Sequence, residues 1–250
     1  MVVGLDRWRS HFAKYADRYV MVGGVACEQL MDEAGLRFRL TNDFDVVLLV
    51  ELLDASFAEA FWGFIEAGGY ERREKAEGGK LYRFENPTMP DYPQMIELFS
   101  RAPEGFELAQ GSHLTPLPID EAAASLSAIL LDSGYYDYLQ ANARQIDGLP
   151  LLSEAGMIPF KARAYLDLSS RKAAGENIDS KKVKKHRNDV FRVLQLLPED
   201  ASYSVPDAIK ADMSAFLDAV AKDDSFKPAD FDVKLPPDVA ISRLARAFDL

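Results

Sequence analysis

Residues 43–50 read DFDVVLLV, and this stretch is the strongest indication of the fold in the sequence. The Val and Leu content is typical of a strand that is buried in a sheet. Side chains alternate between the faces of a strand, so Asp43 and Asp45 point to one side while Phe44 points into the core. Two neighbouring carboxylates repel each other unless a cation lies between them. We therefore expect this strand to hold a hard divalent cation, with Mg²⁺ as the first choice and Mn²⁺ as the alternative.

A glycine turn precedes this strand. Residues 19–22 form a short apolar run that ends at Gly23 and Gly24, and residues 25–33 are predicted as a helix. This order places free backbone N–H groups and the positive end of a helix dipole where they can hold a phosphate. A plain turn is the alternative for the glycine pair, and an Asp-rich strand end is the alternative for the acid pair.

Glu97 supplies a third carboxylate, within the apolar run of residues 95–99. A charged residue between large apolar ones suits either an edge salt bridge or a buried functional acid. If its strand lies beside the strand of Asp43 and Asp45, the three acids can hold two ions, one for an attacking hydroxyl and one for a triphosphate. The hypothesis fails if Glu97 points away from the other two acids or if the glycine turn lies elsewhere.

The remaining pattern predicts an α+β fold. An N-terminal domain of residues 1–152 has a mixed sheet with flanking helices, and an α-helical domain of residues 153–250 follows. The expected elements are a helix over residues 55–67, strands over 80–84 and 94–99, a helix over 120–131, a hairpin turned at Asp147-Gly148, and four C-terminal helices marked by Pro159, Ser180 as an N-cap, Pro206 and Pro237.

Composition narrows the class of protein. The net charge of −11 opposes long-range attraction to a polyanion, so nucleic acid needs a local patch. The basic run from Arg171 to Arg187 is the candidate patch, and a solvated helix face is its alternative. The lone Cys27 cannot form an internal disulfide and is expected to be a small buried residue. No signal peptide or membrane anchor is recognisable, so we expect a cytoplasmic protein with no membrane partner.

Three short motifs resemble the DNA polymerase β-like nucleotidyltransferase superfamily: Val22-Gly23-Gly24-Val25-Ala26, Arg39-Leu40-Thr41-Asn42-Asp43-Phe44-Asp45-Val46-Val47, and Glu97. More narrowly, the chain is similar to AbiEii-type abortive-infection nucleotidyltransferases. These include the toxins of type IV toxin–antitoxin pairs and the MenT tRNA-modifying toxins. That family also has a helical motif with a lysine, matched by Lys161, and a later aspartate after basic residues, matched by Asp189. The resemblance spans residues 19–197.

The resemblance implies transfer of a nucleotidyl group from a nucleoside triphosphate to a hydroxyl acceptor, with release of pyrophosphate. Implied partners are tRNA or another RNA as acceptor and, for a toxin, an antitoxin protein. The implied catalytic residues are Asp43, Asp45, Glu97, Lys161 and Asp189. Of these, Asp43, Asp45 and Glu97 hold two Mg²⁺ ions, with Glu97 as third ligand or general base. The implied nucleotide-binding residues are Gly23, Gly24, Arg39, Thr41 and Lys161.

Individual roles follow from this resemblance. Lys161 clamps the triphosphate, near the start of its helix, and Asp189 orients Lys161 or the acceptor. Arg39 contacts the nucleotide or forms a structural ion pair. Many superfamily members have Gly-Ser where this chain has Gly23-Gly24, which leaves Thr41 or backbone amides to contact the phosphate.

Other functions use the same Asp-x-Asp pattern. A metal-dependent glycosyltransferase binds a nucleotide sugar with it, but its design lacks an upstream glycine turn. A haloacid dehalogenase-like phosphatase has its aspartates after an apolar strand, which residues 39–42 do not form. A third alternative is a catalytically silent module of the same fold that binds nucleotide, RNA or an antitoxin.

Overall fold

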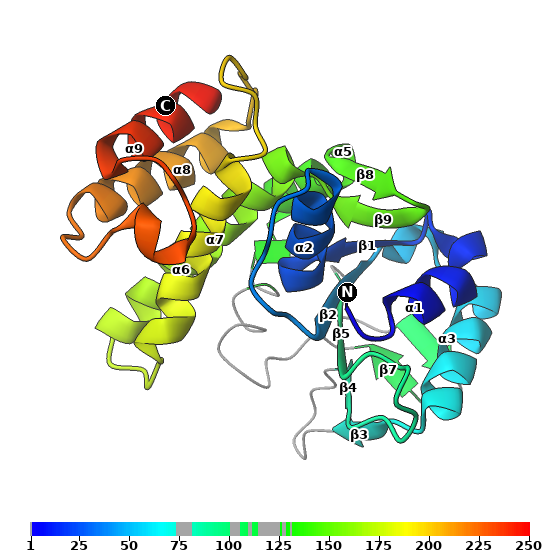
Figure 1. The fold of residues 1–250 in the computed structure, drawn as a ribbon. Helices are drawn as coiled ribbons and strands as arrows, with labels where there is room; N and C mark the ends of the chain where they lie inside the picture. Colours follow the sequence, from blue (N-terminus) through cyan, green and yellow to red (C-terminus); the bar gives the residue numbers. More distant parts are fainter. Residues whose placement is uncertain are drawn as a thin grey trace.

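A seven-stranded mixed sheet forms the centre of the N-terminal part (Figure 1). This computed structural model describes residues 2–73, 82–100, 106–109, 112–114, 126, 129–130 and 132–250. The strand order is β3-β4-β5-β2-β1-β9-β8, and a separate two-stranded sheet joins β6 to β7. The strands are β1 (Tyr19–Val22), β2 (Asp43–Leu48), β3 (Glu71–Arg73), β4 (Tyr82–Glu85), β5 (Met95–Ser100), β6 (Phe106–Ala109), β7 (Ser112–Leu114), β8 (Ala143–Ile146) and β9 (Leu149–Leu152).

Strand direction brings three chain segments to one edge of the sheet. β1 runs antiparallel to β2, with Val22 opposite Asp45, and β2 runs parallel to β5, with Asp45 opposite Glu97. The end of β1 therefore lies beside the starts of β2 and β5. The strand of Glu97 therefore lies beside the strand of the acid pair, and the glycine turn lies at the same edge of the sheet, as the hypothesis requires.

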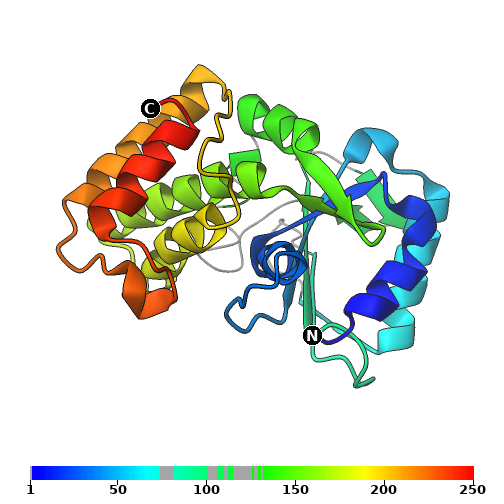
Figure 2. The ribbon, with the colours of Figure 1, turned by 45° about the horizontal axis from the view of Figure 1, so that its top comes forward.

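Helices cover both faces of the sheet (Figure 2). On one face lie α1 (Leu5–His11) and α3 (Ala55–Gly68), joined to the sheet by Trp8, whose ring centroid lies 5.8 Å from Phe44 and 5.4 Å from Phe64. Phe44 is fully buried, as its place between two outward-facing acids predicts. On the other face α2 (Gly23–Glu33) contacts α6 (Glu154–Ala173) and α7 (Ser180–Leu194).

The C-terminal part is helical. α6 packs against α7 and against α8 (Asp207–Ala221), which in turn contacts α9 (Pro237–Ala247). The predicted α+β class, a mixed sheet with flanking helices followed by helices alone, is confirmed. The remaining helical elements are α5 (Ser133–Ala141) and three 3₁₀ turns, η1 (Ala13–Tyr15), η2 (Val50–Leu52) and η3 (Pro228–Phe231).

Several local predictions can be compared with the structure. The hairpin turn at Asp147 and Gly148 is confirmed, because both residues have the positive φ (48° and 77°) that a type I′ turn needs. The N-cap of α7 is Asp179 and not Ser180, because the Asp179 carboxylate accepts a hydrogen bond from the backbone N–H of Lys181. Pro206, which the sequence places at the first position of its helix, is the N-cap of α8, and the helix begins one residue later. Most of the helix predicted over residues 120–131 lies outside the described residues.

The junction between the two parts is short. β9 ends at Leu152, and Ser153 caps α6 by accepting a hydrogen bond from the N–H of Gly156 at 3.2 Å. Buried apolar side chains of the sheet and of the C-terminal helices belong to one continuous cluster. The division into domains 1–152 and 153–250 therefore stays a prediction. None of the described helices has the length and apolarity needed to cross a membrane.

Candidate active site

A cavity of about 190 Å³ lies where the sheet edge meets α6 and α7. This volume far exceeds the ~10–15 Å³ that one water molecule needs, so the cavity can take a ligand. The sheet and α2 contribute Val22, Gly23, Gly24, Asp43, Asp45, Met95, Glu97 and Phe99, whereas α6 and α7 contribute Met157, Phe160, Lys161, Ala164, Lys182, Lys185 and His186. The glycine turn and the three acids are thus in one place, as the sequence hypothesis requires.

The glycine turn forms the start of α2. Gly23 has φ +69°, and a Cβ there would collide with Oδ2 of Asp45. The N-cap residue Val22 gives no side-chain hydrogen bond to the first turn. The first N–H groups of an α-helix have no partner within the helix, so these groups remain available to an anion at the cavity.

Thr41 lies against the second glycine. A Cβ on Gly24 would collide with Oγ1 of Thr41, and Thr41 is only 8% exposed. The Thr41 hydroxyl therefore takes up the space that a serine side chain at position 24 would need. Any side chain at position 24 would therefore have to displace Thr41.

Asp43 and Asp45 are partly buried and line the cavity together. Neither forms an ion pair with a cation of the described residues. Burial raises the pKa of Asp45, Asp43 raises it further, and the ammonium group of Lys161 acts in the opposite direction. Two acids close together without a counterion are an electrostatic arrangement that a bound cation relieves.

The sequence context of Glu97 left two alternatives, a salt bridge or a buried functional acid, and the structure shows features of both. It lines the cavity beside Asp45, close enough to hydrogen-bond with it, yet it also forms a buried salt bridge. Arg83 on β4 is its register partner, with Nε 2.7 Å from Oε1 and with Nη2 contacting the same oxygen. Arg83, which sequence reasoning missed, therefore neutralises much of the charge of Glu97.

The fit of the three acids to a divalent cation depends on Glu97. Within the described part of the chain, no three His, Cys, Asp or Glu residues are placed to hold a metal ion together. The expected triad is thus not assembled as three free ligands, because Glu97 is turned to Arg83. Asp43 and Asp45 alone still fit Mg²⁺, which commonly binds through one or two carboxylates and completes its shell with water and substrate phosphates. The metal site stays a prediction.

Lys161 and Asp189 form the centre of a buried ion cluster. Lys161 is 5% exposed and its Nζ lies 3.6 Å from Oδ2 of Asp189, which is fully buried. Arg192 donates to the other carboxylate oxygen at 2.9 Å. Burial alone would raise the pKa of Asp189, but Lys161 and Arg39 outweigh it and lower the pKa to about 2.

Two expectations for this cluster need correction. α6 begins at Glu154, about two turns before Lys161, so the helix dipole adds little at the lysine. Arg39, expected either on the nucleotide or in a structural pair, binds Asp189 through Nε at 3.1 Å and Nη2 at 2.9 Å. Arg39 is therefore a structural partner of Asp189 and is not among the residues that line the cavity.

The basic run from Arg171 to Arg187 does not form one solvated face. Arg171 pairs with Glu176, and Arg187 is buried and pairs with Asp223. Lys185 and His186 line the cavity, which sequence reasoning did not anticipate. Lys185 is also exposed, as expected for a surface lysine, whereas His186 is half-buried. A helical-face analysis could have found them, because residues 182, 185, 186 and 189 share one face of α7, just as residues 157, 160, 161 and 164 share one face of α6.

Comparisons with known proteins give one weak structural similarity and no sequence match. No protein-family model and no curated protein sequence matches the chain. Among solved structures, the chain is similar to the solution structure of the antibiotic-resistance factor ANT(2'')-Ia. The similarity covers 86% of this chain and 93% of that chain, with 13% sequence identity and a TM-score of 0.37. A likeness this weak carries no conclusion about function, which is therefore inferred from the cavity itself.

Proposed function

We propose that the protein is a metal-dependent nucleotidyltransferase that uses a nucleoside triphosphate. The supporting observation is the composition of one cavity. It is lined by the start of an uncapped helix at Gly23, an acid pair without a counterion at Asp43 and Asp45, and a buried lysine at Lys161. An anion is attracted by the helix start and the lysine, whereas a cation is attracted by the acids. A triphosphate with a divalent cation satisfies both.

The reaction needs a hydroxyl oxygen to attack the α-phosphorus of the triphosphate. A new P–O bond forms, the bond to the β-phosphate breaks, and pyrophosphate leaves with its electron pair. The hydroxyl proton goes to a carboxylate among Asp43, Asp45 and Glu97. A divalent cation held by Asp43 and Asp45 supplies neutralisation of the phosphate charge.

The other residues bind and position the nucleotide. The N–H groups at Gly23 and Gly24 and the hydroxyl of Thr41 contact phosphate oxygens. Lys161 contacts the triphosphate, and Asp189 holds Lys161 in place through the ion pair. Arg83 fixes the orientation of Glu97 in the same way. We also propose that the enzyme is of the AbiEii type. It would then be a cytoplasmic toxin that transfers the nucleotidyl group to an RNA and is bound by an antitoxin protein.

A labelling experiment tests the proposal. Purified protein is incubated with each α-³²P-labelled triphosphate, with Mg²⁺ or Mn²⁺, and separately with tRNA, other RNA, aminoglycosides or no added acceptor. We expect label on one acceptor class and stoichiometric pyrophosphate. Binding of the triphosphate without transfer to any acceptor would show a silent binding module, and consumption of nucleotide sugars alone would show a glycosyltransferase.

Matched variants show whether transfer depends on this cavity. Asp45→Asn keeps the size of the side chain and removes its charge, so we expect a loss of transfer of at least ~100-fold. Asp238→Asn makes the same change at an exposed position on α9 and should keep full activity. Equal activity of the two variants would contradict the assignment of the site.

A further inference from the structure

Lys185 is a cation without a counterion. It lies on α7 and lines the cavity together with the acids, and it forms no ion pair with any residue of the described part of the chain. The neighbouring cavity lysine, Lys161, already shares the carboxylate of Asp189 at 3.6 Å. Asp45 and Asp189 act on the charge of Lys185 without forming an ion pair with it, so its ammonium group stays available to a ligand.

The surroundings of Lys185 disfavour its charged form, although the residue is exposed. Desolvation lowers the pKa of Lys185, the nearby cations Arg39 and Lys161 lower it further, and the acids Asp45 and Asp189 act in the opposite direction. His186 responds to the same field: burial, Lys161 and Lys185 lower its pKa to about 3, so the ring is neutral at pH 7. Like charges gathered around one cavity are typical of a site that receives a polyanion.

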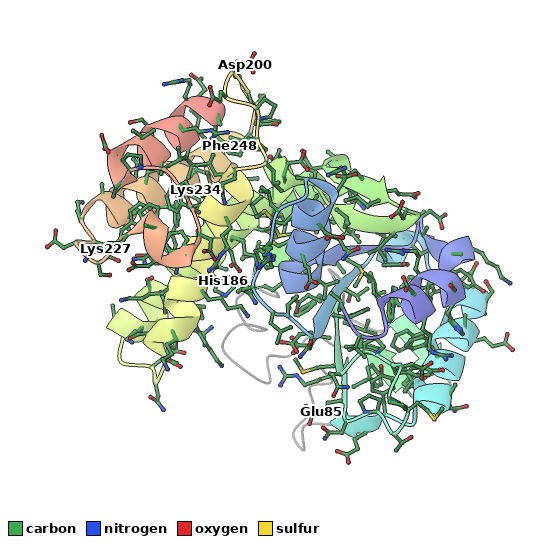
Figure 3. All side chains as sticks on the ribbon, in the orientation of Figure 1. Glu85, His186, Asp200, Lys227, Lys234 and Phe248 are labelled. Atoms are coloured by element: carbon green, nitrogen blue, oxygen red, sulfur yellow. The ribbon has the colours of Figure 1, made fainter. Side chains whose placement is uncertain are left out.

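His186 gives a second observation that points to a ligand. Its Nδ1 is fully covered and has no hydrogen-bond partner among the described residues. In Figure 3, His186 lies on the side of α7 that is turned toward α2. Buried polar atoms are nearly always hydrogen-bonded, so an unpaired ring nitrogen at the cavity indicates a site that a bound molecule completes.

We propose that Lys185 is a specificity-determining residue that selects a triphosphate over shorter phosphate chains. This inference rests on the proposed function for the identity of the ligand. Three positive groups then approach the polyphosphate from separate elements: the start of α2, Lys161 on α6 and Lys185 on α7. Each additional phosphate adds negative charge, and Lys185, unlike Lys161, shares no carboxylate in an ion pair within the described residues.

Binding of the four nucleoside monophosphates, diphosphates and triphosphates tests this selectivity, by calorimetry without added divalent cation. Lys185→Ala should weaken binding of the preferred triphosphate about tenfold and that of its monophosphate less than twofold. Lys185→Arg should restore most of the difference. Lys184→Ala is the matched control, because Lys184 is the adjacent lysine of the same helix, is exposed like Lys185, and is not among the residues that line the cavity. The inference is wrong if Lys185→Ala and Lys184→Ala bind every phosphate chain alike.

The imidazole of His186 provides a readout that needs no turnover. Inorganic tripolyphosphate placed beside Lys161 and Lys185 cancels their field, so the pKa of His186 should rise when it binds. NMR titration of the ring should show this rise in the wild type and a smaller one in Lys185→Ala. An unchanged rise in the variant would overturn the inference, and so would a variant that loses only labelling of an RNA acceptor.

The two proposals fail separately. If the wild type prefers triphosphates through Lys185 but transfers no nucleotidyl group, the selectivity stands and the enzymatic function falls. If the wild type transfers a nucleotidyl group and Lys185→Ala keeps full triphosphate preference, the function stands and the selectivity falls.

Discussion

Two carboxylates close to the cavity differ in their electrostatic surroundings. Asp189 on α7 is fully buried and contacts three cations, Arg39, Lys161 and Arg192. Asp45 on β2 lines the cavity beside Asp43 and has no ion-pair partner among the described residues. The pKa of Asp189 is lowered to about 2, whereas burial raises the pKa of Asp45.

The difference in ion pairing indicates that Asp189 stabilises the fold, whereas Asp45 is available to bind a ligand. Removing one member of a buried ion pair leaves the others uncompensated, so the paired acid is needed for stability. An unpaired acid near a like charge costs stability in the free protein, so its presence needs another reason, such as ligand binding. Substitutions at the two sites should therefore have opposite effects.

The largest effect is expected at the paired acid. Asp189→Asn leaves Arg39, Lys161 and Arg192 without a carboxylate, and should lower the free energy of unfolding by ~3–5 kcal/mol. Asp249→Asn is the control, because Asp249 pairs with Lys210 at 2.9 Å on the surface, where water screens the pair, so its loss should have little effect on stability. Urea unfolding followed by circular dichroism measures both. If Asp189→Asn lowers the free energy of unfolding no more than Asp249→Asn does, Asp189 is not the structural acid that its three ion pairs indicate.

The next effect concerns the contact between the glycine turn and Asp45. Gly23→Ala should cost ~2–3 kcal/mol, from the left-handed backbone together with a collision with Oδ2 of Asp45. Gly35→Ala has the same φ of +69° and open space around it, so only the backbone term of ~1 kcal/mol applies. Chemical unfolding of the two variants gives the difference, and equal costs would mean that Asp45 does not lie against Gly23.

The third prediction concerns the pH dependence of stability that His186, beside the lysines of the cavity, should produce. The folded-state pKa of His186 is about 3, below its ordinary value of 6.5. Between those values the unfolded chain binds a proton that the folded chain does not, so stability falls as the pH falls, by at most ~1.4 kcal/mol per pH unit. The charged groups that act on the ring are Lys161 on α6, Lys185 and Asp189 on α7, and Arg39.

His186→Gln should flatten the stability profile between pH 6 and 4. His11→Gln serves as the control, because His11 is exposed at the surface. Urea unfolding at several pH values measures the slopes. Identical slopes for the wild type and His186→Gln would show that the ring is not held neutral. Asp189 and Asp45 also contribute to the pH dependence, but both are present in the wild type and in His186→Gln, so their contribution is common to the two profiles.

The smallest effect on stability is expected at the unpaired acid, and its sign is the informative part. Asp45→Asn removes repulsion with Asp43, so the free energy of unfolding should stay the same or rise by up to ~1 kcal/mol. A thermal unfolding scan against wild type and Asp238→Asn measures this. A loss of more than ~1 kcal/mol would show that Asp45 has a structural partner and would weaken the proposed site.

Much of the site could be predicted because it follows from local patterns. Alternation in a strand places Asp43 and Asp45 on one face, and a glycine pair after an apolar run predicts the turn into α2. The two-residue hairpin at Asp147 and Gly148 follows from turn chemistry in the same way. Lys161 and Asp189 could be assigned only through resemblance, because nothing in their local pattern indicates burial.

Other features depend on contacts between distant residues. Glu97 and Arg83 meet because β4 and β5 pair in a particular register, and register is not visible in either strand alone. α1 and α5 were not anticipated, because both are short and their helical character depends on packing against α3 and α6. Lys185 and His186 were grouped with surface charges because their direction depends on how α7 packs on α6.

The sequence by itself determined the sheet-and-helix class, the acid pair and the glycine turn, because backbone geometry and side-chain alternation are local properties. Only the tertiary structure decided which charges are paired. Arg39 and Asp189 are 150 positions apart in the chain, and their contact neutralises one acid, while Asp45 has no ion-pair partner among the described residues. The energy of a buried charge depends on its neighbours in space, and those neighbours are set by the packing of the whole chain.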